Sequence, residues 1–88
     1  MNLVLTADGD VNPVEPENGK DFSLKELKSH IGGGYIEIVP VDDDHYMVCD
    51  EDGQAKELPL NPLANILYGP RLGFIVGDVL VCERDKIK

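Results

Sequence analysis

The chain is organised around Ile31-Gly-Gly-Gly-Tyr-Ile-Glu-Ile-Val-Pro40, because the sequence predicts that a helix ends and a strand begins there. Gly32 suits the position after a helix, where a left-handed backbone conformation costs glycine nothing. From Tyr35 to Val39 the sequence alternates, so Ile36 and Ile38 share one face of a strand. We expect this junction to end the first helix and to start the central strand of a sheet.

The helix before the glycines has clear start signals. Ser23 is an N-cap, and Glu26 lies three residues later, which gives a capping box. Phe22 and Leu27 are spaced to form the hydrophobic staple that accompanies such a cap. An apolar residue every three or four positions completes the pattern. We expect a helix over residues 24–31.

The beginning of the chain resembles a hairpin followed by a loop. Residues 2–6 are mostly apolar, an Asp-Gly turn follows, and residues 11–14 can pair back as a second strand. Pro13 cannot donate to a sheet ladder, so this return strand belongs at an edge. Residues 15–21 are polar and contain proline and glycine, which is typical of a loop.

Acidic turns separate the segments after the first strand of the sheet. Asp42 to Asp44 precede an apolar segment at residues 46–49, and residues 50–53 form a second acidic turn. Residues 54–58 can return as a further strand. We therefore expect an antiparallel meander of three strands over residues 35–58.

A second helix is predicted after the meander. Asn61 is a good N-cap and Pro62 suits the first helical position. The helix then runs over residues 62–68, with Leu63, Ile66 and Leu67 on one face, and Gly69-Pro70 ends it.

The last apolar segments predict strand structure. They are residues 74–76 and 79–82. The segment from Val79 lacks alternation, which indicates burial on both faces of the sheet.

These elements predict one α+β domain over residues 1–88. We expect a mostly antiparallel sheet of four to six strands with two short helices on one face. Residues 1–21 form the N-terminal hairpin and loop, residues 22–83 the core, and residues 84–88 a charged tail. A domain this small gains core if it forms a homodimer.

The charge and the apolar segments limit the location and the partners. The net charge is −9, which disfavours direct nucleic-acid binding and favours a basic protein partner. The N-terminus lacks the basic region of a signal peptide, and no apolar run reaches the ~20 residues that span a membrane. Two cysteines do not make a disulfide framework. We expect a soluble, cytoplasmic protein without membrane contact.

Four segments in a fixed order resemble a known family. They are Gly33-Gly-Tyr-Ile-Glu-Ile-Val-Pro40, Val48-Cys-Asp-Glu-Asp-Gly53, Leu58-Pro-Leu-Asn-Pro62 and Ile75-Val-Gly-Asp-Val-Leu-Val81. The pattern is similar to the bacterial and phage family called domain of unknown function 3846, over about two thirds of the chain. The resemblance implies a small protein of phages, plasmids or their hosts. That family brings no established activity, so no catalytic residue is carried over.

The sequence contains no catalytic or metal-binding pattern. The triple glycine follows a helix, whereas phosphate loops precede one. An EF-hand loop aligned on Gly53 would need an acidic residue at Val48 and a glutamate at Pro59. The histidines and cysteines match no zinc spacing, and no base can be named for a cysteine nucleophile. We expect no catalytic residue, no metal, no cofactor and no enzymatic activity.

Five residues are the candidates for specific contact with a partner. Tyrosine and arginine are enriched at interfaces, and the candidates are Tyr35, Glu37, Asn61, Tyr68 and Arg71. Tyr35 and Glu37 share the strand face opposite Ile36 and Ile38. The equally weighted alternative is that they only cover a sheet edge.

Three functions follow as hypotheses. The first is a non-catalytic accessory module that binds a protein. The second is an acidic DNA mimic that inhibits a nuclease or restriction enzyme, which requires acidic residues along one face. The third is a protein that sequesters a nucleotide, which requires an oligomer interface to bring Arg71 and lysine side chains together.

Overall fold

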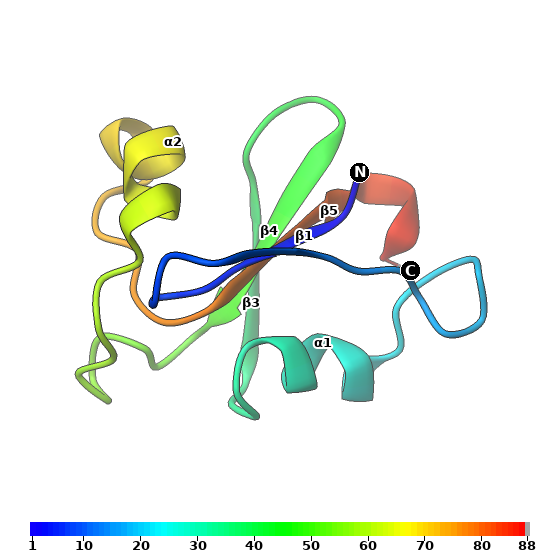
Figure 1. The fold of residues 1–88 in the computed structure, drawn as a ribbon, viewed down its shortest axis with the longest axis horizontal. Helices are drawn as coiled ribbons and strands as arrows, with labels where there is room; N and C mark the ends of the chain where they lie inside the picture. The colour runs from blue at the N-terminus through cyan, green and yellow to red at the C-terminus, as the bar shows by residue number, and fades with distance from the viewer. Residues whose placement is uncertain (88) are drawn as a thin grey trace.

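A computed structural model describes residues 1–87 of the chain. Five antiparallel strands form one sheet, in the order β2-β1-β5-β4-β3. The strands are β1 (Leu3–Leu5), β2 (Val11–Pro13), β3 (Ile36–Pro40), β4 (His45–Asp50) and β5 (Val79–Glu83). Two helices, α1 (Leu24–His30) and α2 (Pro62–Leu72), accompany the sheet (Figure 1). The predicted α+β class is confirmed.

The last strand in the sequence occupies the centre of the sheet. β5 lies between β1 and β4, and four of its five residues are buried. The predicted burial on both faces is therefore confirmed. The prediction that the strand after the glycines is central is wrong, because β3 is an edge strand. Beyond β5, Arg84–Lys86 of the predicted tail form a 3-10 turn, and Lys88 lies outside the described residues.

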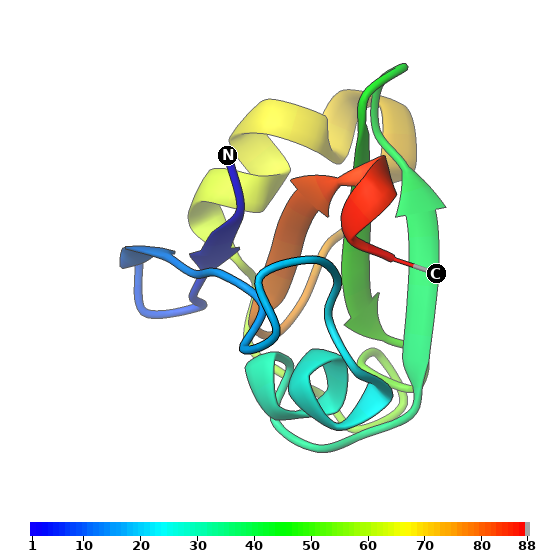
Figure 2. The same cartoon turned by 90° about the vertical axis from the view of Figure 1, so that its right-hand side faces the viewer.

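The two helices cover opposite faces of the sheet, as Figures 1 and 2 show. Around α1, one apolar cluster contains Phe22, Leu27, Ile31, Val4, Val48, Leu80 and Cys82. Around α2, the other contains Ala64, Leu5, Val41, Met47, Ile75, Val79 and Val81. The expectation that both helices share one face is wrong. Because successive residues of a strand point to opposite faces, a fully apolar β5 needs a helix on each side.

The first helix begins at Leu24, as its sequence predicts, and ends at His30, one residue before the predicted end. The Ser23 Oγ accepts from the Glu26 N–H at 3.1 Å, and the Ser23 N–H donates to the Glu26 carboxylate at 2.8 Å. Phe22 and Leu27 are both buried, in the positions of the predicted staple. Gly32 follows the C-cap with a φ of 92°, a conformation that disfavours other residues.

The second helix is longer than predicted. It passes through Gly69-Pro70 and ends at Leu72, and Gly73 follows with a φ of 82°. The expected stop at Gly69-Pro70 is therefore wrong. Pro70 has no backbone N–H to donate within the helix. The last turn of α2 forms without that hydrogen bond. Of the predicted apolar face, Ile66 and Leu67 lie on the solvent side, with 73% and 58% of their surface exposed.

The predicted third strand of the meander is absent from the described residues. Residues 51–57 form consecutive turns, so the expected strand at 54–58 is wrong and only the β3–β4 hairpin remains. Glu57 has a positive φ of 55°, which is incompatible with an extended strand. The expected strand at 74–76 is reduced to one bridge between Leu60 and Val76.

A proline blocks the open edge of β3. The Val41 N–H donates to the His45 carbonyl, and the Tyr35 carbonyl accepts from the Glu51 N–H. Hydrogen-bonded positions alternate along an antiparallel pair. The backbone N–H and C=O groups of odd-numbered residues of β3 therefore bond to β4, whereas those of even-numbered residues point outward from the sheet edge. Pro40 is thus an outward position, where it removes an edge donor without loss of a ladder bond.

The opposite edge repeats this arrangement. The Val14 N–H donates to the Asn2 carbonyl and the Thr6 N–H to the Asp10 carbonyl, so even-numbered residues of β2 bond to β1. Pro13 therefore also faces outward, and its predicted edge position is confirmed. Both edges lack one donor that a foreign strand would use.

Replacing Pro40 with valine is expected to make the protein associate. The valine restores an outward N–H on an extended edge whose neighbouring side chain, Ile38, is 40% exposed. Sedimentation velocity of Pro40→Val should show a concentration-dependent dimer that the wild type does not form under the same conditions. Pro59→Val, a change outside the strands, is the control. A Pro40→Val variant that sediments like the wild type would contradict this role.

Candidate functional site

A cleft of about 450 Å³ opens on the α2 side of the β3–β4 hairpin. The hairpin supplies one wall, the loop after β4 supplies the second, and the segment after α2 supplies the third. The lining residues are Glu37, Val39, Met47, Cys49, Asp50, Glu51, Asp52, Gln54, Ala55, Leu72, Phe74, Ile75 and Val76. The volume falls within the range of roughly 300–1,000 Å³ that is usual for ligand pockets.

The inner wall of the cleft is apolar. Met47 and Ile75 are buried, while Val39 and Leu72 are half-buried. In the β3–β4 hairpin, Val39 pairs with Met47 and Glu37 pairs with Cys49. The side chains of both pairs therefore lie on one face of the sheet. This surface offers contact to an apolar or aliphatic group.

The rim of the cleft is acidic. Glu37, Glu51 and Asp52 are exposed, and no basic residue lines the cleft among the residues described. Asp50 lines it too, but its carboxylate accepts from the Lys56 ammonium at 2.8 Å. The cleft therefore attracts positive charge and repels anions.

Asp50 holds the loop that forms the second wall. Only 4% of its side chain is exposed, and it accepts from Lys56 and from the Asp52 N–H, both at 2.8 Å. Gly34 packs against this carboxylate, because a Cβ there would lie 2.4 Å from the Asp50 Oδ2. The third glycine of the junction thus makes room for the loop anchor.

Acid is expected to release this anchor. The hydrogen bond from Lys56, followed by that from the Asp52 N–H, lowers the pKa of Asp50. The unfolded carboxyl has a pKa of about 3.9, so the stabilisation is present above about pH 4. It is lost as the pH falls through the lower folded pKa. Urea unfolding should show a gap between wild type and Asp50→Asn that is constant from pH 7 to about pH 4.5 and shrinks below.

The matched control for this measurement is Asp8→Asn, which alters an exposed carboxylate in the β1–β2 turn. A gap for Asp50→Asn that begins to shrink near neutral pH would contradict the lowered pKa. A gap that persists undiminished down to pH 2 would also contradict it.

The cysteine in the cleft is not an activated nucleophile. Burial, and then the charges of Glu37 and Asp50, raise the pKa of Cys49 to about 11. Its Sγ donates to the Glu37 carbonyl at 3.8 Å. The histidine nearest in sequence, His45, bonds to the Asp42 carboxylate instead. The thiol therefore stays protonated at neutral pH, where a protonated thiol is a poor nucleophile.

Large apolar side chains are exposed on and beside α2. Leu60, Ile66, Leu67 and Phe74 each have more than half of their surface exposed. We call these four residues the α2 surface. Phe74 belongs both to this surface and to the cleft, and Leu60 pairs with Val76 of the cleft wall.

Two of the predicted contact residues, Glu37 and Tyr35, line neighbouring hollows of the surface. Glu37 lines the cleft itself. Tyr35 is 68% exposed and lines an adjacent hollow together with Lys28 and Lys56. The Lys28 ammonium lies 5.3 Å from the centroid of the Tyr35 ring, a cation–π distance. Asp52 lines both hollows, so Tyr35 and Glu37 are close to one another without sharing a pocket.

Of the other predicted contact residues, Asn61 is buried, Tyr68 is half-buried and Arg71 is exposed but bonded to the backbone. Asn61 is fully buried and bonds to backbone groups, which leaves it no surface for a partner. Tyr68 is half-buried against the cluster around α2, and this burial raises its pKa. The Arg71 guanidinium donates to the Val41 carbonyl at 2.8 Å, which ties the end of α2 to the β3–β4 turn.

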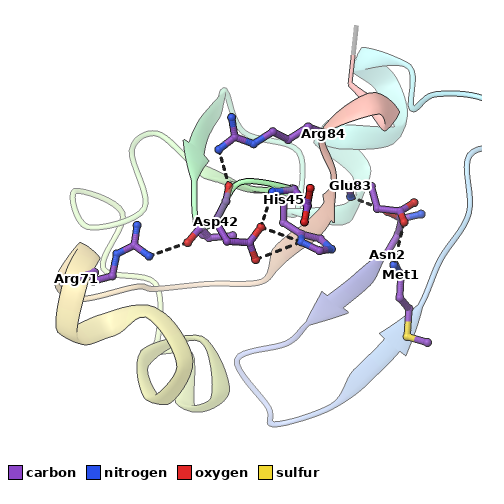
Figure 3. Close-up of polar contacts among 9 residues, drawn as sticks. Met1, Asn2, Asp42, His45, Arg71, Glu83 and Arg84 are labelled. Carbon is purple, nitrogen blue, oxygen red and sulfur yellow. Dashed lines mark hydrogen bonds and ion pairs between the residues drawn. The ribbon is translucent and has the colours of Figure 1, made fainter.

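Figure 3 shows the polar contacts around that turn. Arg84 and Arg71 donate to neighbouring carbonyls, those of Asp42 and Val41, while the Asp42 carboxylate accepts from the His45 ring at 3.0 Å. The backbone N–H of Asp44 and the His45 ring lower the pKa of Asp42. These contacts fix the turn.

Sequence reasoning missed the cleft and the residue at its mouth. Phe74 resembled the start of a strand, and the loop after β4 resembled a returning strand. The detectable signal was Gly73, which suits a helix C-terminus as well as Gly69 does. A helix that ended at Gly73 would have left Phe74 in a loop.

The metal and membrane expectations can be compared with the described residues. Residues 1–87 contain no group of three or more potential metal ligands in suitable positions. They also contain no helix long and apolar enough to cross a membrane. Cys49 and Cys82 are both free thiols.

Comparison with known proteins gives a family. No curated protein and no solved structure matches the chain. A family model described as a domain of unknown function, DUF3846, matches residues 1–88. The match includes the N-terminal hairpin, which the motif resemblance does not reach. The chain therefore belongs to the DUF3846 family.

Proposed function

We propose that this protein is a non-catalytic accessory module that binds another protein through the α2 surface. The observation that carries the proposal is the exposure of Ile66, Leu67 and Phe74, at 73%, 58% and 76%. Large apolar side chains exposed on a helix and on the segment that follows it commonly mark an interaction site. Phe74 adds an aromatic anchor, a residue type enriched in binding hot spots.

The partner that fits this surface is a basic protein. The acidic rim of the cleft adjoins Phe74, and the whole chain carries a net charge of −9. A second copy would bring a like-charged surface to the same place, which disfavours a homodimer through this face. A partner with apolar side chains flanked by basic ones matches both features.

The other two hypotheses have less support. Exposed acidic residues lie in separate turns at both ends of the sheet, in the segments 8–10, 42–44 and 51–52. A DNA mimic needs them along one face. A nucleotide would meet Lys28 and Lys56 in the hollow beside Tyr35, but Lys56 is already paired with Asp50.

We also propose a biological setting for this protein. The setting we propose is a small protein of phages or mobile elements that acts in the cytoplasm of a bacterial host. The acidic surface would then serve solubility and partner choice together.

Affinity capture from a lysate of the source cells tests the proposed function. Wild type is compared with Ile66→Glu/Phe74→Glu, which alters the α2 surface. The control is Val11→Glu/Leu24→Glu, the same charge change at exposed apolar residues on β2 and α1. All four sites are exposed, so each substitution should change stability by no more than ~0.5 kcal/mol.

The expected result is a basic protein that the wild type and the control retain and the α2 variant loses. Capture that is equal in all three, or capture of the protein's own copies alone, would overturn the proposal. Circular dichroism of each variant confirms that the fold is unchanged.

A further inference from the structure

We infer that the cleft beside Phe74 receives the side chain of an arginine from the bound protein. This inference rests on the proposed function, because it names what the partner inserts next to the α2 surface. Three features carry it: an aliphatic wall, unpaired carboxylates at the rim and an exposed aromatic ring at the mouth.

The inner wall matches the stem of an arginine. Met47, Val39, Leu72 and Ile75 offer apolar surface to three methylene groups. Arginine commonly buries this stem along apolar surface while its charged end stays near solvent. The cleft, at about 450 Å³, has room for one such side chain and part of its neighbour.

The rim supplies the counter-charge. Among the described residues, Glu37, Glu51 and Asp52 form no salt bridge, whereas Asp50 is paired with Lys56. A guanidinium presents five donors in a fork that matches carboxylate oxygens. Charge-assisted hydrogen bonds of this kind are about twice as strong as neutral ones. The rim therefore selects a cation that has several donors.

The aromatic ring favours arginine over lysine. Phe74 stands at the mouth with 76% of its surface exposed, and the Gln54 amide donates to its carbonyl at 3.4 Å across the cleft. A planar guanidinium stacks on an aromatic face, while a compact, strongly hydrated ammonium gains less there. The acidic residues that line the cleft, with no basic residue among its described lining, also exclude an anionic guest.

A titration with short peptides tests this directly. The probes are acetyl-Leu-Arg-Leu-amide, its lysine counterpart and its citrulline counterpart, which has the shape of arginine without the charge. Two-dimensional NMR of the ¹⁵N-labelled protein follows the amide signals of the cleft.

The arginine peptide is expected to shift the signals of Glu37, Cys49, Glu51 and Asp52. Lysine should bind more weakly, and citrulline should bind at least tenfold more weakly. The variant Glu37→Gln/Glu51→Gln/Asp52→Asn should also lose at least tenfold in affinity. The charge-matched control Asp8→Asn/Asp10→Asn/Glu15→Gln, made at exposed acids outside the cleft, should bind like the wild type.

Equal affinity for the arginine and citrulline peptides would overturn the inference. Equal loss of affinity in the two triple variants would also overturn it, as would amide signals that do not shift at millimolar peptide. The two proposals fail separately. If the α2 variant loses the captured partner while the peptides leave the cleft signals unchanged, the arginine inference is wrong and the proposed protein-binding function is retained. If the peptides bind in the cleft while the α2 variant captures the same proteins as the wild type, the proposed function is wrong.

Discussion

Replacing Asn61 with alanine is expected to lower the free energy of unfolding by about 3–5 kcal/mol. The Asn61 amide donates to the Leu5 carbonyl at 2.8 Å and to the Gly77 carbonyl at 2.9 Å. Its side-chain oxygen accepts from the Ala64 N–H at 3.1 Å and so caps α2. One side chain therefore joins β1, the segment before β5 and the start of α2.

The size of the effect follows from burial. Asn61 has no exposed surface, so water cannot replace the lost partners in the folded protein. Each buried polar group left unpaired costs about 1–3 kcal/mol, and loss of an N-cap typically costs about 1 kcal/mol. A domain of this length is stabilised by roughly 4–13 kcal/mol in total, so the variant should be near its unfolding threshold.

Urea unfolding followed by circular dichroism measures this effect, because the sequence has no tryptophan to report it by fluorescence. Asn12→Ala, at an exposed position of β2, is the control and should change stability by less than ~0.5 kcal/mol. Asn61→Ser keeps a cap acceptor but cannot reach both carbonyls, so it should fall between the two. A loss below about 1 kcal/mol for Asn61→Ala would contradict the role of this residue as a buried connector.

Replacing Leu80 with alanine is expected to cost about 3 kcal/mol. Leu80 is fully buried in the central strand, within the cluster that Phe22, Leu27 and Val48 also form. The truncation leaves a cavity under α1, and neighbouring strands on both sides limit how far the structure can collapse into it. The loss should therefore weaken the attachment of α1 more than that of α2, which packs on the other face.

The same urea measurement tests this prediction, with Leu24→Ala as the control. Leu24 is 57% exposed on α1, so its truncation should cost less than ~0.5 kcal/mol. Hydrogen exchange should show faster opening of α1 in Leu80→Ala, while α2 keeps more of its protection. Equal stability of the two variants would show that β5 is not the centre of the core.

Local signals predicted the first helix well. The capping box at Ser23 and Glu26 and the glycine at position 32 act within a few residues of one another, and the structure has all of them. The hairpin with Pro13 at an edge was also predicted, because the missing N–H of proline restricts its position whatever the rest of the fold does.

Nonlocal packing explains what the sequence did not reveal. The strand after the glycines has the most regular alternation, yet β3 lies at the edge, because the more apolar β5 occupies the centre. The apolar pattern of Val79 to Cys82 already required cover on both faces. Placing both helices on one face was inconsistent with that pattern, and the structure resolves the conflict.

The candidate site was only partly predictable. Glu37 was named and lines the cleft, but the cleft depends on a loop that periodicity assigns to a strand. Asn61 was correctly predicted as a cap, and this role buries it, so it cannot also contact a partner. Leu63, Ile66 and Leu67 were predicted to share one face, but Leu63 packs against the cluster around α2 while Ile66 and Leu67 are exposed.

Hydrogen–deuterium exchange of the captured complex measures whether the α2 surface binds a basic protein. The proposal predicts that binding slows exchange in residues 60–76, which include α2, Phe74 and a wall of the cleft. Exchange in β2 and α1 should stay as it is in the free protein. Protection confined to β2 or α1, with residues 60–76 unchanged, would contradict the claim.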